Sequence, residues 1–228
     1  MRKRSIVLLT VIAAVTSATE AAELRGQDAP TIAIMDFNSF MMGQGGASVE
    51  LGKAISAMLV TEFSGRDGLR VVERQRLLDL IQEQDLTYSG RVEEAIEVGK
   101  MLGVQYVMLG QVTSIVDNLR MDIRAVDVET SEVLSVHKKS DKTSELFQVV
   151  VDLADEFGTQ LDLTPPSGRP EMEPIPVRAT IEFSRAVDFE DSGDIELAIQ
   201  HYEATLEIHP SHRDARRALD RLRGGIQT

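Results

Sequence analysis

The chain of 228 residues contains no cysteine. Disulfide bonds, thiolate metal ligands and a lipid-bearing amino-terminal cysteine are therefore excluded. The sequence also has no nucleophile elbow of the G-x-S-x-G type. No isolated pair of acids in apolar surroundings suggests acid–base catalysis either. Nothing in these patterns predicts an enzyme or a lipoprotein.

Basic residues are few. Lysine and arginine number 24 against 37 acidic residues, which gives a formal net charge of −13. If residues 1–22 are removed, three basic residues and one acid are lost, and −13 becomes −15. Such an acidic balance argues against nucleic acid or anionic lipid as the main partner.

Residues 1–22 have the pattern of a signal peptide. Arg2, Lys3 and Arg4 precede an apolar stretch at residues 6–15, and small residues follow. Cleavage is expected after Ala18, Ala21 or Ala22. The alternative is a membrane anchor, but the apolar stretch is well short of the roughly 20 residues that a spanning helix needs. We therefore predict export.

Hydrophobic periodicity predicts alternating helices and strands up to residue 161. Residues 106–109 are almost continuously apolar, which indicates a strand covered on both faces. Residues 121–125 alternate apolar with charged side chains, which indicates a strand with one solvated face. The predicted strands are 31–37 and 69–72 and a three-strand meander over 106–140. The predicted helices are 48–64, 74–84, 92–102 and 144–161.

Four phrases in fixed order carry a family resemblance: TIAIMDF, VVERQRL, LGVQYVMLG and VDVETSEVL. Over residues 31–161 the chain resembles the family of the curli assembly and transport component CsgG. That group is also similar to the periplasmic activators of penicillin-binding proteins and to the TolB amino-terminal domain. The resemblance implies an α/β domain at 30–163, a layered mixed β-sheet with flanking helices. It also implies a periplasmic location.

The curli member of that family forms a pore by inserting two hairpins into the outer membrane. Membrane strands need about 9 to 11 residues each, so each hairpin needs roughly 20 extra residues. The connections at residues 117–119 and 140–143 are too short for either insertion. We therefore expect a relative without a pore of its own.

Five of the seven prolines fall within residues 165–176. A proline-rich segment is extended by about 3.1 Å per residue, so a linker at 164–178 could separate two domains by about 40 Å. We predict a semi-rigid spacer.

Residues 193–210 resemble the second half of a tetratricopeptide repeat (TPR). Gly193 ends the inter-helix turn, Ala198 takes the helix-contact position and Pro210 stops the second helix. A helix at 179–191 and a cap helix at 213–223 complete a small all-α unit over 179–223. One repeat with a cap is too small to be stable alone. It must pack on its own first domain, on a partner or on another copy, unless the hairpin resembles the repeat by chance.

Two patterns fall short of a ligand site. The glycine-rich segment at 43–48 begins too far from the preceding strand for a dinucleotide fingerprint, and residues 46–53 lack the spacing and hydroxyl of a P-loop. No carboxylate pair or cysteine completes a tetrahedral metal set with the histidines. We expect solvent-facing turn histidines, no metal and no cofactor. The histidines are His137, His201, His209 and His212.

Two charged segments have plain structural explanations. The charges at residues 73–84 are expected to form a solvated helix face with pairs spaced three and four apart. The alternative is that Glu73 and Arg74 position the strand-to-helix junction. The arginines of the helix at 213–223 either bind an anionic partner or complement the helix carboxyl end.

Together these patterns predict a non-enzymatic periplasmic adaptor for envelope assembly or secretion. Its partners are proteins, it has no evident small-molecule substrate, and it could form homo-oligomers. Phe183 and Val187, on the inner face of the first repeat helix, are the predicted partner contacts. The alternatives are a regulator of peptidoglycan synthesis and a nucleotide-dependent envelope enzyme.

Overall fold

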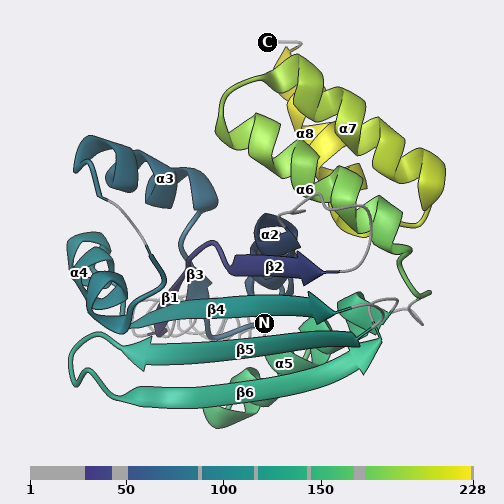
Figure 1. The fold of residues 1–228 in the computed structure, drawn as a ribbon. Coiled ribbons are helices and arrows are strands. Elements are labelled where there is room, and N and C mark those ends of the chain that lie inside the picture. Colours follow the sequence, from purple (N-terminus) through teal and green to yellow (C-terminus); the bar gives the residue numbers. More distant parts are fainter. Residues whose placement is uncertain are drawn as a thin grey trace, which may run out of the picture.

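The computed structural model describes residues 29–42, 51–86, 89–115, 118–142, 145–166 and 173–226 (Figure 1). The predicted signal peptide and the glycine-rich segment at 43–48 lie outside the described residues, as does the middle of the predicted linker.

Within the described residues, six strands form one mixed sheet in the order β3-β1-β4-β5-β6, with β2 also paired to β4. The pairs among β1, β2, β3 and β4 are parallel, whereas β4, β5 and β6 form the predicted antiparallel meander. Parallel neighbours require long crossovers, which here contain helices. The strands are β1 Thr31–Ile34, β2 Asn38–Met42, β3 Arg70–Val71, β4 Tyr106–Ile115, β5 Asn118–Asp127 and β6 Val133–Lys142.

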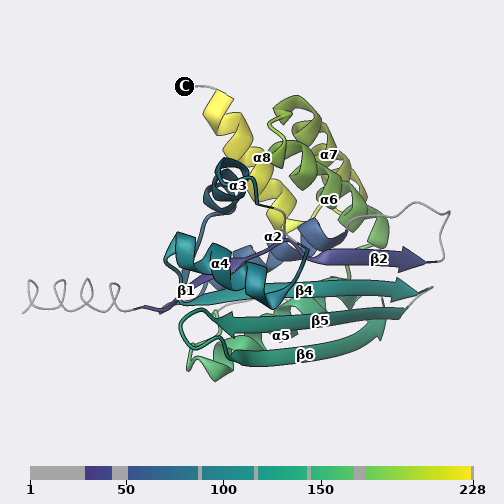
Figure 2. The same cartoon turned by 60° about the vertical axis from the view of Figure 1, so that its left-hand side comes forward.

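Helices cover both faces of this sheet, with α4 and α5 on opposite faces (Figures 1 and 2). The fold is therefore the predicted mixed α/β class. The helices are α2 Leu51–Ser64, α3 Arg74–Glu83, α4 Val92–Leu102, α5 Leu146–Gln160, α6 Val177–Asp191, α7 Ile195–Ile208 and α8 Arg213–Ile226.

Strand β4 separates two hydrophobic cores. Successive side chains of a strand point to opposite faces. Tyr106 and Met108 thus join the larger core with α2 and α5, while Val107 and Leu109 join a smaller core under α3 and α4. All four are buried, which confirms that this strand is covered on both faces.

Helix α2 contributes its apolar stripe to the larger core as its spacing predicted. The five stripe residues are at most 1% exposed: Leu51, Ile55, Met58, Leu59 and Phe63. The Phe63 ring meets the Phe157 ring of α5 edge-on, at 5.5 Å between centroids. On the opposite face, α4 ends at Gly103, whose φ of 68° is the left-handed conformation that glycine favours.

The predicted strand at 31–37 is shorter than expected, and a strand that was not predicted follows it. Ile34 pairs with Met108, and Asn38 pairs with Gln111. Three residues on one strand therefore lie opposite two on β4, which defines a β-bulge. The bulge bends the chain and turns Asp36 off the sheet, so that its carboxylate accepts from the Ser56 hydroxyl at 3.1 Å.

Helices α6, α7 and α8, here called the helical unit, pack on α2 at the end of the molecule away from β6 (Figures 1 and 2). Their buried residues are continuous with the larger core. Of the three possibilities for stabilising this unit, the structure has packing on the first domain. A single apolar face this small gains more from burial against α2 than from standing free.

The prediction of a spacer that separates two domains by about 40 Å is therefore wrong. Ile175, near its end, is only 5% exposed and belongs to the larger core. The described end of the proline-rich segment therefore joins the core that the helical unit shares with the α/β domain.

Two histidines predicted to face solvent are buried. His209 is 8% exposed and His212 only 1%. The His212 ring lies 4.7 Å from the Phe183 ring, and its Nδ1 accepts from the Ala215 backbone N–H at 3.3 Å. The turn between α7 and α8 folds under α6, so these rings fill the helical unit's core.

Candidate functional site

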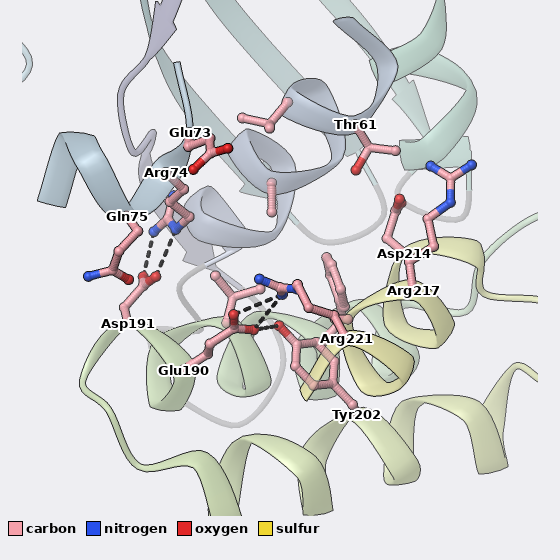
Figure 3. A pocket seen from close by; sticks show the side chains of 15 residues that line it. Thr61, Glu73, Arg74, Gln75, Glu190, Asp191, Tyr202, Asp214, Arg217 and Arg221 are labelled. Carbon is pink, nitrogen blue, oxygen red and sulfur yellow. Dashed lines mark hydrogen bonds and ion pairs between the residues drawn. The ribbon is translucent and has the colours of Figure 1, made fainter. Parts of the chain in front are cut away.

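A pocket of about 500 Å³ lies where the helical unit meets α2 and the start of α3 (Figure 3). Its apolar lining comes from α2, α6 and α8, with Ala57, Val60, Phe183, Val187 and Ala218. Charged and polar side chains ring this lining. A volume of several hundred Å³ with a few placed polar groups is typical of binding sites.

Arg74, the first residue of α3, connects three elements at the edge of this pocket. Its Nη2 lies 2.9 Å from Asp36 Oδ2 of the bulge, and its Nε lies 2.8 Å from Asp191 Oδ1 of α6. A second N–H contacts each carboxylate. Burial opposes the charge of Arg74, but the hydrogen bonds to Asp191 and Asp36 outweigh it and raise its pKa above the ordinary value. Arg74 therefore stays charged and fixes α6 to the α/β domain.

The same edge carries a second cation, Lys53 of α2. It forms an ion pair with Asp188, and its Nζ lies 3.5 Å from Asp191 Oδ2. Burial opposes the charge, but these two carboxylates raise the pKa of Lys53. Two cations from the α/β domain thus meet two acids at the end of α6.

Inside the pocket, Tyr202 of α7 donates to Glu190 Oε2 at 2.8 Å, and Arg221 of α8 lies 2.8 Å from Glu190 Oε1 (Figure 3). Burial, and then the charge of Glu190, raise the pKa of the Tyr202 phenol. Because the phenol remains protonated, it donates to Glu190, and the trio joins the three helices.

Asp214 lies at the opposite side of the pocket, on the first turn of α8. It is 6% exposed, and its Oδ1 has no hydrogen-bond partner among the described residues. Burial raises the pKa of Asp214 to about 6, against the effects of a hydrogen bond with Thr61 and the charge of Arg213. Arg213 itself lies 2.8 Å from Glu62 Oε1 of α2, which adds another ionic contact between the two parts.

Phe183 and Val187, the predicted partner contacts, are 2% and 4% exposed in this structure. They are covered by this chain. The Tyr202 ring, for example, lies 5.8 Å from the Phe183 ring between centroids and is tilted relative to it. Their contact with a second protein stays a prediction, and it would require the helical unit to move off α2.

The arrangement has the space and the charged rim to hold a ligand or a second helix. The charged groups that meet here are mostly paired with one another. Among the residues that the structure describes, no group of three His, Asp or Glu side chains could hold a metal ion. None of the helices in the described stretches has the length and hydropathy needed to cross a membrane.

Sequence reasoning located Arg74 but not its partners. The junction role considered for it is local, whereas its carboxylates come from residues 36 and 191. Three arginines of α8, Arg213, Arg221 and Arg223, likewise bind acids of this chain. Only the clustering of acids at the end of α6 hinted at these contacts.

The family model described as curli production assembly/transport component CsgG matches residues 12–115, slightly less than half of the chain. The described part of this match runs from β1 to the end of β4. No curated protein matches the sequence.

Solved structures with a similar fold come from bacterial proteins. The LpoB carboxy-terminal domain from Salmonella enterica has 19% identity and a TM-score of 0.42, covering 50% of this chain and 84% of that one. TolB from Acinetobacter baumannii has 17% identity and a TM-score of 0.43, covering 59% and 28%. Lipoprotein GNA1162 from Neisseria meningitidis has 13% identity and a TM-score of 0.44, covering 57% and 98%.

Proposed function

We propose that this protein is a non-enzymatic adaptor of the bacterial cell envelope. Its α/β domain engages an assembly or secretion complex, and its helical unit holds a second protein. The observation that carries the proposal is the match of residues 12–115 to an assembly and transport family, in a chain that adds a second, docked unit.

The joint between the two parts supports a binding role. Its ionic part consists of Arg74, Lys53 and Arg213 with their acids, placed around a pocket. Beside it, the helical unit also shares apolar contacts with the larger core. Water can solvate the charges that separation releases, which lowers the cost of opening the joint at the pocket. On separation, Phe183 and Val187 become available to a partner.

A TPR-like reading of α6 and α7, with α8 as the cap, fits this proposal. Ala186 and Ala198, at the small-residue positions of the repeat pattern, are both 0% exposed. Helix pairs of this kind recognise other helices or peptides in a groove, and here α2 packs on α6.

The adaptor is proposed to work without a pore of its own. Strand β4 ends at residue 115 and β5 begins at 118, while β6 ends at 142 and α5 begins at 146. Neither connection has the roughly 20 residues that a membrane hairpin needs. Export by residues 1–22 to the periplasm is part of the same proposal.

Site-specific crosslinking in intact cells tests this function. A photo-crosslinking residue is placed at Gln200, exposed on α7, and in a separate variant at Met101, which is 50% exposed on α4. The adaptor role predicts protein adducts from both positions, with different partners. It also predicts that cell fractionation finds the protein in the periplasm. Absence of adducts at both positions, or retention in the cytoplasm, would contradict the proposal.

A further inference from the structure

Part of one sheet face has no helix over it among the described residues (Figures 1 and 2). Helices α3 and α4 cover the end of that face where Val107 and Leu109 are buried, and the rest of β2, β4 and β5 is uncovered (Figures 1 and 2). Strand register places seven described residues on this open face: Asn38, Phe40, Gln111, Thr113, Arg120, Asp122 and Arg124.

A polar pocket of about 260 Å³ lies where the open face meets the loop before α4. The Asn38 side chain donates to the Ser89 carbonyl at 3.2 Å, which holds this loop against the sheet. The Ser89 backbone N–H in turn donates to Glu94 at 2.7 Å. The wall of the pocket is therefore built by bonds that do not use the arginines on its floor.

The charge on this face is opposite to that of the chain. Arg120 Nε donates to Asp122 Oδ2 at 2.9 Å, so these two neutralise each other. Arg124 lines the pocket, is exposed, and makes no ion pair among the described residues. Among the described side chains of this face, the Arg124 guanidinium therefore adds a positive charge that no carboxylate pairs, on a chain of net charge −13.

The chemistry of Arg124 selects a carboxylate. A guanidinium presents a rigid fork of N–H donors that matches a carboxylate in bidentate geometry. The neighbouring Gln111 amide adds a donor at the pocket. Phe40, which is 50% exposed on the same face, offers an apolar surface to the rest of the ligand.

We propose that the open face binds an acidic polypeptide segment, with one Asp or Glu carboxylate on Arg124. A single segment meets only the local positive charge. A nucleic acid or an anionic membrane would approach the whole acidic chain and meet its long-range repulsion. This inference concerns the α/β domain alone and does not depend on the adaptor proposal.

Fluorescence anisotropy with the full mature chain tests the inference. The probe is a labelled short peptide in which glutamate alternates with threonine, and its control replaces glutamate by glutamine. We expect the acidic peptide alone to bind, more weakly as salt rises to about 0.15 M because screening shortens the range of the attraction.

Charge reversal locates the site. Arg124→Glu is expected to weaken binding about tenfold or more, and Arg124→Gln less. Arg178→Glu, an exposed position on α6, makes the same change in net charge and is expected to leave binding unchanged. Equal loss from Arg178→Glu and Arg124→Glu would overturn the site. Failure of the wild-type chain to bind the peptide would also overturn it, as would tighter binding to phosphatidylserine vesicles that Arg124→Glu abolishes.

Discussion

Helix α2 contacts its neighbours on two sides, and the two sides are held by different forces. Toward the sheet and α5 it buries a complete apolar stripe, including Ile55 and Phe63 at 0% exposure. Toward the helical unit it offers Lys53 and Glu62 to ion pairs, and its Ala57 and Val60 border a pocket of about 500 Å³.

The difference separates what makes the domain stable from what positions the second unit. Apolar burial is insensitive to salt, and truncating it leaves a cavity. Partly exposed ion pairs respond to salt and contribute less, because solvent screens them. The sheet side therefore contributes most to the stability of the α/β domain, whereas ion pairs add to the shared apolar contacts in positioning the helical unit.

The largest expected effect tests the sheet side. Phe63→Ala removes a fully buried ring and its edge-on contact with Phe157. We expect the free energy of unfolding to fall by about 3–5 kcal/mol, because the surroundings cannot close the cavity. Urea denaturation followed by circular dichroism measures this. A loss below about 1 kcal/mol, the usual value for a tolerated core change, would show that α2 is not the centre of this core.

The next effect concerns pH and the helical unit. Burial, then the charges of His209 and Arg213, lower the pKa of His212 to about 4. The unfolded chain therefore binds a proton there between pH 6.5 and 4 that the folded chain does not, and acid destabilises the fold. Asp214, with its pKa raised to about 6, acts in the opposite direction: the folded chain keeps a proton that the unfolded chain releases above pH 3.8.

Single variants separate the two effects. In Asp214→Asn, the free energy of unfolding is expected to fall by up to about 3 kcal/mol as the pH drops from about 7 to about 4. In His212→Gln, the free energy of unfolding is expected to rise, relative to that of the parent chain, as the pH drops over the same range. Urea titrations at several pH values measure both. Three indistinguishable profiles would mean that neither group is buried as the structure has it.

A smaller effect tests how closely α2 approaches the bulge. A Cβ added at Gly52 would lie 1.7 Å from the Phe37 carbonyl oxygen, so Gly52→Ala forces the helix or the bulge to shift. We expect a loss of about 2 kcal/mol in thermal or urea unfolding. Gly224→Ala is the matched control, since nothing lies within 4 Å of its added Cβ. That change is expected to stabilise α8 by about 0.5–1 kcal/mol. Equal effects from both substitutions would contradict the close approach.

The smallest effect concerns the joint itself. Arg74→Met keeps the aliphatic stem but leaves Asp36 and Asp191 without their shared cation. We expect a loss of about 1–2 kcal/mol at low salt, shrinking as salt screens the pairs. Arg223→Met, in an exposed pair with Glu203, is expected to change nothing measurable. If Arg74→Met and Arg223→Met change the free energy of unfolding equally at low salt, the ion pairs of Arg74 do not hold the joint.

Much of the fold could be predicted from periodicity. The α2 stripe, the antiparallel meander and the three helices after the linker were each indicated by residues at fixed spacing. Such patterns are local, so a single strand or helix carries them in its own sequence. The strand Asn38–Met42 was not predicted, since a bulge of three residues separates it from β1 and interrupts the alternation.

The candidate site was harder to predict. Arg74 was noted as a junction charge, but its partners lie 38 and 117 positions away in sequence. His212 was expected in solvent because turns usually lie on the surface, yet this turn is covered by Phe183. Pairing between residues so far apart in sequence depends on which surfaces meet in the folded chain. A local sequence pattern contains no information about those surfaces.

By itself, the sequence determined the class of secondary structure, the acidic character, the absence of cysteine chemistry and the family resemblance over residues 31–161. Each follows from composition or from spacing along the chain. The tertiary structure decided that the helical unit folds back onto α2, that Phe183 and Val187 are covered, and that Arg124 lies on the part of one sheet face that α3 and α4 do not cover. Those outcomes depend on which apolar faces bury each other and on how oppositely charged residues from distant segments meet, and only the folded chain brings them together.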